Sequence, residues 1–376
     1  MLYFDCAASH APFAEALRIH DEAAMNLFGN ANSTHGFGFS MKKRLEEARK
    51  EILSVLGLEK THALLFTSGA TESNNLALHG IAKSYANRGK KILISSVEHP
   101  SVLNPALELR EQGFDVIELP VNEKGFVEPK TLQEAMDDHV ILVSIMGVNN
   151  EVGTIFPIHE YKQILSAYPK CYFHSDMTQG IGKVAFPYGE VDLISFSGHK
   201  LGGLKGTGAL IYKKSIRLHP LFQGGEQEGS IRPGTVNVPG ALSLAYAVKR
   251  SVQERVEDFK KEAALRDYLV QKLSQIEEIS FNSPLDGSPY VFNFSLTKHK
   301  GSVVVEGLSE KEIYVSSVSA CNSKGELISH VLLAMGKTER EAANSIRVSL
   351  PSDASLADLD CFIDELKALL NKLKTI

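Results

Sequence analysis

The sequence predicts an α/β protein with a mainly parallel sheet, followed by a smaller α+β domain. Two observations support this prediction: short apolar runs alternate with helix-length segments from residue 63 to Tyr212, and this alternation stops after Tyr212. Alternating strands and helices are typical of a parallel sheet that is covered by helices. The 376 residues leave room for two domains. We expect a large domain over residues 11–250 and a small one over residues 251–376 that also includes residues 1–10.

Seven apolar runs in the first part of the chain have the length and composition of strands. They cover residues 63–66, 91–95, 115–119, 140–146, 171–174, 191–196 and 208–212. Segments between them have the length of helices, namely residues 71–88, 101–112, 130–138 and 157–167. Because ligands bind beyond the carboxyl ends of parallel strands, the residues that follow each strand are the first candidates for function.

The last third of the chain has a different pattern. A glycine-rich loop over residues 223–240 precedes residues 241–276, which read as one long helix without internal proline or glycine. Beyond it we expect strands near residues 291–296, 312–316 and 346–350, and helices near residues 327–335 and 354–374. This mixture predicts the smaller α+β domain, which the long helix joins to the sheet.

Composition and charge exclude several classes of protein. The net charge of −5 leaves no basic footprint for nucleic acid. No apolar run approaches the ~18 residues of a membrane span, and residues 1–10 lack the pattern of a secretory signal. The four cysteines form no CxxC pair, so we expect neither a metal site nor a disulfide framework. These observations predict a reduced, cytoplasmic protein.

A lysine stands at the carboxyl end of one predicted strand. Residues 197–200 read SGHK and directly follow the strand candidate at residues 191–196. A lysine in this place can form a Schiff base with an aldehyde cofactor such as pyridoxal phosphate (PLP). Position alone favours an ordinary surface lysine, so the assignment of Lys200 depends on its neighbours.

Three further strand ends carry residues that suit such a cofactor. Asp176 follows the strand at residues 171–174 and could hold a ring nitrogen protonated, although it could also cap a turn. Residues 67–71, TSGAT, lead into a helix whose N-terminal N–H groups could bind phosphate or could form a simple capped helix start. His99 follows the strand at residues 91–95 and could stack on a ring or be structural. Together these features indicate a cofactor with an aldehyde, a ring and a phosphate.

Six segments match motifs of one known family, in the order of that family and from residue 3 onward. They are FTSGATES at 66–73, VNNEVG at 148–153, SFSGHK at 195–200, RPGT at 232–235, SAC at 319–321 and IR at 346–347. Through these segments the chain resembles the cysteine desulfurases, PLP-dependent enzymes of the class V aminotransferase family. The resemblance implies fold type I of the PLP enzymes, with a seven-stranded sheet in the large domain.

The resemblance also implies roles for individual residues. Lys200 would bind PLP covalently, and His99 would stack on the ring and assist catalysis. Asp176 would pair with the ring nitrogen, and Gln179 would bond the phenolic oxygen. Arg347 would bind the carboxylate of the amino acid, because a guanidinium can donate two hydrogen bonds to it.

The remaining implied contacts are to the phosphate and the amino acid. Asn150 would lie between the cofactor and the amino acid. Thr235 would reach the phosphate bound in the partner subunit, which implies a homodimer. The other phosphate contacts would come from Ala70, Thr71, Ser197, Gly198 and His199.

Cys321 separates the reactions that are possible on this fold. It stands in a small polar run at residues 316–323 that reads as a loop. A thiolate there can attack the sulfur of a bound cysteine and become a persulfide, although a free cysteine is more often a small buried apolar residue. Cys171 and Cys361 lie at positions with apolar spacing, and we expect both in the core. Cys6 has no assigned role.

Several positions depart from the family pattern. Glu226 replaces a glycine, and Val318 replaces a glycine shortly before Cys321, where a β-branched residue stiffens the loop. These departures concern substrate preference, rate and partner choice, and none replaces the lysine, the acid or the cysteine. The other departures are at Ser9, His10, Gly202, Leu204 and Pro351.

The function implied by the resemblance is the conversion of L-cysteine to L-alanine, with a persulfide on Cys321. The sulfur would pass to an acceptor such as an iron–sulfur scaffold or a thiolation protein. Two other interpretations stay open: a selenocysteine lyase or related PLP β-lyase, and a PLP-binding scaffold or regulator without turnover. The intact Lys200, Asp176 and Cys321 argue against the scaffold.

Overall fold

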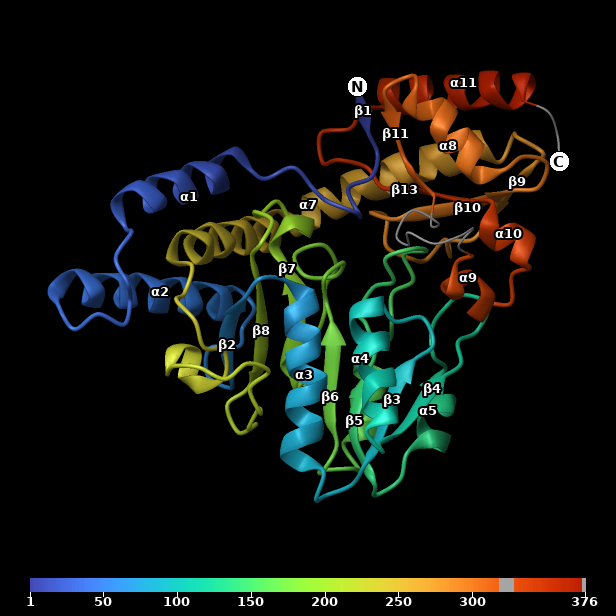
Figure 1. Cartoon of the computed structure of the whole chain (residues 1–376). Helices are drawn as coiled ribbons and strands as arrows, with labels where there is room; N and C mark the ends of the chain where they lie inside the picture. Colours follow the sequence, from blue (N-terminus) through green and yellow to red (C-terminus); the bar gives the residue numbers. More distant parts are fainter. Residues whose placement is uncertain (318–327, 374–376) are drawn as a thin grey trace.

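The computed structural model describes residues 1–317 and 328–373, and its centre is a seven-stranded sheet (Figure 1). The strand order is β2-β8-β7-β6-β5-β3-β4. Strands β3 to β7 pair in parallel, and β8 runs antiparallel to both β2 and β7. The predicted mainly parallel sheet is therefore confirmed. The bounds are β2 His62–Thr67, β3 Lys91–Ser95, β4 Asp115–Leu119, β5 Val140–Ser144, β6 Tyr172–Asp176, β7 Leu193–Ser197 and β8 Gly208–Lys213.

Helices cover both faces of this sheet. Helices α3 (Ala70–Tyr85) and α4 (Pro100–Glu111) pack on one face, where their side chains join Ile92 and Ile94 of β3 in one apolar cluster. Leu93, the residue between them, belongs to the cluster on the other face. There the cover comes from α2 (Gly36–Val55), α6 (Ile158–Leu165) and the first half of α7 (Val238–Leu273). Because successive side chains of a strand alternate between faces, both faces need apolar residues, and the strands read as continuous apolar runs.

A second sheet lies in the C-terminal part of the chain (Figure 1). Its order is β12-β13-β10-β9, with bounds Ser316–Ser317, Ser345–Val348, Phe292–Leu296 and Ile279–Phe281. A separate apolar cluster joins it to the second half of α7, to α8 (Gly301–Ser309) and to α11 (Leu356–Lys372). Strand β1 (Leu2–Tyr3) pairs in parallel with β11 (Ile313–Tyr314), so the N-terminal residues lie among the C-terminal elements.

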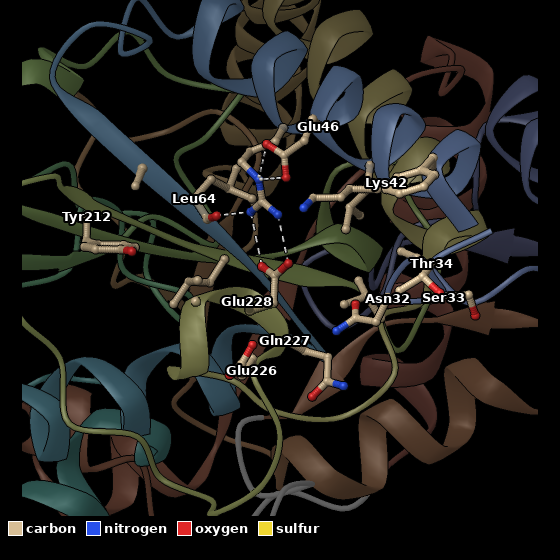
Figure 2. Close-up of a pocket in the computed structure, with 18 residues that line it drawn as sticks. Asn32, Ser33, Thr34, Lys42, Glu46, Leu64, Tyr212, Glu226, Gln227 and Glu228 are labelled. Carbon is tan, nitrogen blue, oxygen red and sulfur yellow. Dashed lines mark hydrogen bonds and ion pairs between the residues drawn. The ribbon is translucent and has the colours of Figure 1, made fainter. Parts of the chain in front are cut away.

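Two polar side chains close the outer edge of β2 (Figure 2). Glu228, on the turn η3 (Gln227–Ser230), accepts a hydrogen bond from the backbone N–H of Phe66 at 2.9 Å. The guanidinium of Arg49 on α2 donates to the carbonyl oxygen of Leu64 and to both carboxylate oxygens of Glu228, at 2.8 and 3.1 Å. Edge groups that are satisfied in this way are not available for pairing with another strand.

Some boundaries differ from the sequence-based expectation. The long helix begins at Val238, three residues earlier than expected, because the side chain of Asn237 caps it by accepting from the N–H of Gly240. The strand expected at residues 312–316 is two short strands, β11 and β12, which pair with different partners. None of the helices described in residues 1–317 and 328–373 is both long and apolar enough to cross a membrane.

The structure also contains elements that were not expected from the sequence. They are α1 (Ala14–Asn26), α2, α8, α10 (Glu339–Ala343), β1 and β9. Helix α5 (Pro129–Ala135) is found near its expected place, and the helix expected at residues 327–335 is the shorter α9 (His330–Ala334).

Candidate active site

Lys200 lies at the carboxyl edge of the large sheet, on a single 3₁₀ turn that directly follows β7. Its amine donates to the carbonyl oxygens of Ala7, and of Ala8 at 2.8 Å, in the N-terminal segment. Burial lowers the pKa of Lys200 to about 8, and the positive charges of Arg347 and Lys183 act in the same direction. A lysine with this pKa is partly neutral near physiological pH, and the neutral amine is the form that reacts with an aldehyde.

Asp176 is the last residue of β6, the strand next to β7, and it is buried. One carboxylate oxygen accepts from the N–H of Thr178 at 2.9 Å, so Asp176 does cap a turn. The other oxygen accepts from the side-chain amide of Asn74 on α3 at 2.7 Å, and this amide also donates to Ser101 at 2.8 Å. The second oxygen is thus held by Asn74 of α3, which is itself fixed by Ser101 of α4, and a simple turn cap does not need this contact.

The N-terminus of α3 and the end of β7 meet in a tight backbone cup. The N–H of Ala70 donates to the hydroxyl of Ser197 at 2.7 Å. A Cβ on Gly69 would lie 3.1 Å from that hydroxyl, and a Cβ on Gly198 would lie 2.3 Å from the hydroxyl of Thr207. Neither position has room for a side chain, so both favour glycine. The N–H groups and the dipole of a helix N-terminus favour an anion.

The other residues expected at the phosphate lie around this cup. Thr71 is exposed in the first turn of α3. His199 lies on the turn before Lys200, with its Nδ1 3.4 Å from the hydroxyl of Ser9. Burial, together with nearby lysines, lowers the pKa of His199 to about 4, so its ring is neutral at pH 7. Thr235 lies before α7 and lines, with Ser68, a hollow of about 150 Å³.

His99 caps the N-terminus of α4 at the carboxyl edge of the sheet. Its Nδ1 accepts from the N–H of Ser101 at 3.1 Å and contacts the hydroxyl of the same residue at 2.8 Å. Burial lowers the pKa of His99. Because Nδ1 accepts, the neutral ring carries its proton on Nε2. The helix cap thus fixes which nitrogen of His99 can donate.

Arg347 comes from β13 of the second sheet and extends to the large sheet. Its guanidinium donates to the backbone carbonyl of Asn150 at 3.0 Å and to the carboxylate of Asp5 at 2.8 Å. The third nitrogen, Nε, is buried and has no hydrogen-bond partner in the structure. The neighbouring Asn149, rather than Asn150, holds the turn through its side chain, which accepts from the N–H of Glu151 at 2.8 Å.

Three residues of this site were not predicted from the sequence. Asp5 holds Arg347, Asn74 holds Asp176, and Lys183 donates to the side-chain oxygen of Gln179 at 3.2 Å. Asn74 directly follows the motif at 66–73, one turn into α3, and its place on the buried side of that helix was the available signal. No sequence pattern pointed to Asp5 or Lys183, because their partners lie far away or on an irregular turn.

The cysteines have different environments. Cys321 and the nearby Val318 lie outside the described residues. Cys171 is buried, as expected, but Cys361 is exposed on α11, so the expectation that it belongs to the core was wrong. The apolar residues of α11 that pack inward are Leu359, Phe362, Ile363, Leu366 and Leu370, which places Cys361 on the other side of the helix. Cys6 is buried, and burial raises the pKa of its thiol to about 12.

One of the departures from the family pattern has a clear packing reason. Gly202 has φ +80°, and a Cβ there would lie 2.4 Å from the ring of Phe13, which fills the space of a larger side chain. The backbone N–H of Phe13 donates to the carbonyl of Gly202 at 2.8 Å. Nothing in the structure explains the residues at Glu226, Leu204 and Pro351.

The residues of the site suit PLP. They offer an amine with a lowered pKa, a buried carboxylate for a ring nitrogen, and a helix N-terminus where Gly69 and Gly198 allow close approach of the backbone. Lys200, Asp176 and Ala70 come from neighbouring elements at one sheet edge, where ligands of open α/β sheets bind. Fold and site together define a PLP-dependent enzyme of fold type I.

Comparison with known proteins identifies the family. The family model described as "Aminotransferase class-V" matches residues 2–362. The cysteine desulfurase IscS of Dictyoglomus turgidum is 38% identical over 379 residues, which cover 100% of this chain and 96% of that protein. The cysteine desulfurase IscS of Methanosarcina thermophila is 38% identical, and the match covers 93% of this chain and 87% of that protein. The chain therefore belongs to the class V aminotransferase family and, within it, to the PLP-dependent cysteine desulfurases.

Solved structures agree with this assignment. A structure described as a NIFS-like protein superposes with a TM-score of 0.92 at 35% identity, over 99% of this chain and 100% of that one. A NifS-like protein from Rickettsia africae superposes with a TM-score of 0.89 at 28% identity, over 99% of each chain. The predicted family, fold and cofactor are confirmed.

Proposed function

We propose that this cysteine desulfurase converts L-cysteine to L-alanine through Lys200 and Cys321, and that it passes the sulfur to an acceptor protein. The observation that carries the residue assignment is the meeting of Lys200, Asp176 and the α3 N-terminus at one sheet edge. When it is bound there, PLP supplies an electron sink that weakens the bonds at the α-carbon of the substrate.

The residues around the cofactor have separate tasks in this proposal. Lys200 binds PLP covalently and, once free, moves the proton at the α-carbon. Asp176 pairs with the ring nitrogen, Gln179 donates to the phenolic oxygen, and His99 lies against the ring. The phosphate is bound by the Ala70 N–H and by the side chains of Thr71, Ser197 and His199, and Gly198 gives it room.

Arg347 binds the substrate carboxylate. In the structure its guanidinium is held by Asp5 and by the carbonyl of Asn150, which aim it toward the edge of the large sheet. A carboxylate of the substrate is a stronger partner for a guanidinium than a neutral carbonyl is, because both groups are charged and two parallel hydrogen bonds can form. Asn150 contributes from the same turn.

Cys321 is the proposed sulfur acceptor within the chain. Its thiolate attacks the sulfur of the bound cysteine, the carbon–sulfur bond breaks, and the carbon is protonated to give alanine while an S–S bond forms. The described residues on both sides of the Cys321 segment support this role, because both contact the candidate site or its neighbours. Before the segment, Ser316 of β12 is paired with Arg347 of β13. After it, Ser329 donates to the buried carboxylate of Glu151, the residue next to Asn150, at 2.5 Å.

The partners and the assembly belong to the proposal. Exposed apolar side chains gather on α1, α2 and the connection between them, with Met25 at 78%, Phe28 at 77% and Phe39 at 61% exposure. Exposed apolar clusters of this kind mark interfaces, which supports a homodimer. In such a dimer Thr235 reaches the phosphate bound in the partner subunit. The acceptor is an iron–sulfur scaffold or a thiolation protein, and the enzyme acts in the cytoplasm.

The division into two domains is also part of the proposal. The large domain covers residues 11–250 and the small domain covers residues 251–376 with residues 1–10. The distribution of the apolar clusters supports it, since Phe4 packs with residues from Leu265 onward and not with the large sheet. Helix α7 spans the boundary. Arg347 and Cys321 then come from the small domain, and the cofactor residues from the large one.

The test measures two products together. PLP-loaded protein is incubated with L-cysteine and a reductant, and alanine and sulfide are measured over time. Equal amounts of alanine and sulfide support the desulfurase proposal. Alanine from selenocysteine without alanine from cysteine identifies a selenocysteine lyase, and no product from either identifies a scaffold; both results contradict the proposal.

A further inference from the structure

A second lysine, Lys183, lies close to Lys200 and has no role in the function proposed above. It follows β6 on the turns that also carry Gln179, and it lines a cavity of about 200 Å³ together with Lys200, Cys6 and Glu262. Its ammonium lies 5.7 Å from the centre of the Tyr290 ring. Burial lowers the pKa of Lys183 to about 8. Partial burial of a lysine is costly to the fold, so a functional role would account for its position.

The hydrogen bonds connect Lys183 to the catalytic lysine through two groups. Lys183 donates to the side-chain oxygen of Gln179 at 3.2 Å. The side-chain NH₂ of Gln179 donates to the carbonyl oxygen of Ala7 at 2.9 Å, and the amine of Lys200 donates to the same carbonyl. An ammonium can only donate, so it determines that Gln179 turns its oxygen toward Lys183 and its NH₂ toward the site. The NH₂ group of Gln179 can then donate a hydrogen bond to the phenolic oxygen of PLP.

Two acidic groups near Lys183 carry little negative charge at neutral pH. Cys6 carries no charge there, since burial raises its pKa to about 12, and burial likewise raises the pKa of Glu262 to about 8. One oxygen of the buried Glu262 has no hydrogen-bond partner. The other charged or titratable side chains that line the cavity are His10, Arg250, Glu254, Asp258 and Tyr290.

The charged groups around Lys200 come from four parts of the chain. Arg347 and Lys183 are positive and disfavour a further positive charge on Lys200, whereas Asp5 and Asp176 are negative and favour it. Asp5 is paired with Arg347, and Asp176 is bonded to Asn74. Among the described residues Lys183 forms no ion pair, in contrast to Arg347, and its charge disfavours a positive charge on Lys200.

We propose that Lys183 is a positioning residue of the active site, which orients the amide of Gln179 and repels positive charge from the nitrogen of Lys200. This inference rests on the proposed function, because it assumes that Lys200 binds the cofactor. It adds a residue whose effect is exerted through Gln179 and through charge, without contact to the reacting atoms.

The test uses the PLP-loaded full chain and follows its visible absorbance between about pH 6 and pH 10. In Lys183→Met the charge and the donor are lost and the shape is nearly kept. The pH at which the absorbance of the Lys200-linked cofactor changes should rise by about one unit, since a like charge nearby shifts a pKa by about that much. Lys183→Arg keeps the charge and a donor, and should restore the wild-type transition.

Two further variants separate the effects. Lys130→Met removes an equal charge from a lysine side chain that is 85% exposed on α5, and should leave the transition unchanged. Lys183→Gln keeps a donor without the charge, so it should show the shift while retaining normal affinity for PLP; it also replaces Lys183→Met if that variant does not fold. PLP-free protein should form its covalent link to PLP several-fold more slowly at pH 7 in Lys183→Met, because less of the Lys200 amine is neutral.

The outcomes are distinguishable from a failure of the proposed function. If the wild type forms no visible, covalently linked chromophore at Lys200, the proposed function is wrong. If the chromophore forms but its transition is the same in wild type, Lys183→Met and Lys183→Gln, the inference about Lys183 is wrong. A shift in Lys183→Arg as large as in Lys183→Met would also overturn it, because packing and not charge would then be the cause.

Discussion

Two cations meet at the active site, and their surroundings suit them to different tasks. Arg347 keeps its charge at any physiological pH and is held by the carboxylate of Asp5. Lys200 has only carbonyl oxygens as partners, and burial lowers its pKa to about 8. The first arrangement suits a permanent anchor for a carboxylate, and the second suits a nucleophile that must lose its proton.

The single amine at the sheet edge leads to the first prediction. Lys200→Ala should abolish the visible absorbance of the purified protein and any cofactor that borohydride can trap, and most of the rate should be lost. Removal of the amine takes away both the covalent link and the base at the α-carbon. Absorbance spectra and mass spectrometry after borohydride treatment measure this, and a trapped cofactor in the variant would contradict the assignment.

At the residue scale, position along the strands predicts candidate residues. The sequence singles out Asp176 and His99 because each stands where a parallel strand ends, and the structure places both at the carboxyl edge of the large sheet. Their roles at the cofactor stay predictions. Asp5 could not be predicted in this way. Its partner Arg347 is 342 residues away, and the pairing depends on how the N-terminal segment folds onto the second sheet.

At the scale of elements, the N-terminus of α3 depends on one glycine. Gly69 has φ +156°, and a Cβ there would lie 3.1 Å from the Ser197 hydroxyl that accepts from Ala70. Gly69→Ala should weaken PLP binding by roughly ten-fold, since strain of this kind costs about 1–3 kcal/mol. The dissociation constant of PLP, measured by fluorescence or absorbance titration, checks this prediction.

Gly57→Ala is the matched control. Gly57 also has a positive φ, +72°, just after α2, but a Cβ there meets nothing within 4 Å. The Gly57→Ala variant should lower the free energy of unfolding by about 1 kcal/mol and leave the affinity for PLP unchanged. Equal losses of PLP affinity in both variants would mean that strain alone, and not the cup, is responsible.

The edge of β2 gives a prediction about stability. Glu228 has φ +47°, a costly conformation for a residue other than glycine, yet it accepts from the N–H of Phe66 and from the guanidinium of Arg49, to which dashed lines join it in Figure 2. Glu228→Gln keeps the shape but leaves the largely buried guanidinium of Arg49 without its anion, so the free energy of unfolding should fall by about 2–4 kcal/mol. Urea denaturation measures the change.

A neighbouring acid serves as the control for Glu228. Glu46 also lies 3.3 Å from Arg49, but its side chain is 54% exposed. Glu46→Gln should change the free energy of unfolding by less than about 1 kcal/mol, as for other exposed ion pairs. A loss in Glu228→Gln no larger than this would show that the edge closure contributes little.

The strands of the large sheet were predictable, and several other elements were not. Buried parallel strands read as unbroken apolar runs such as Lys91–Ser95, which identifies them directly. Helix α1 buries only Ala16 and Ala23, so its sequence shows no strong apolar stripe. Strands β11 and β12 have two residues each and exist because of their partners, and such short elements leave no periodic signal.

At the scale of the whole molecule, the candidate active site is assembled from distant parts of one chain. The N-terminal segment provides Asp5 and the carbonyl of Ala7, the large sheet provides Lys200 and Asp176, and the second sheet provides Arg347. Strand β1 joins the N-terminal segment to β11 (Figure 1). The distance between the residues proposed for the cofactor and those proposed for the substrate therefore depends on how the two sheets pack. This arrangement could be expected only through the family resemblance.

The last prediction concerns Cys321, on which the overall reaction depends. Cys321→Ser should keep PLP bound and should still bind cysteine, because Lys200, Asp176 and Arg347 are unchanged. It should release no alanine from cysteine, because a hydroxyl is a far weaker nucleophile toward sulfur than a thiolate. In the wild type the rate should fall as the pH drops below the pKa of the thiol, whose reference value is about 8.5, since the thiolate is then lost.

Cys361→Ser is the control, because Cys361 is also a free thiol but lies exposed on α11. It should keep full activity on cysteine. Selenocysteine tests the selenocysteine lyase interpretation, since its selenium can leave as elemental selenium without a protein thiol while the β-carbon keeps the electron pair and is protonated. Alanine from selenocysteine in Cys321→Ser would therefore report a lyase reaction at an intact cofactor site. A persulfide that mapped to Cys6, Cys171 or Cys361, or full cysteine activity in Cys321→Ser, would require a different nucleophile. Cys6 is then the least suitable candidate, because burial raises its pKa to about 12 and leaves almost no thiolate at neutral pH.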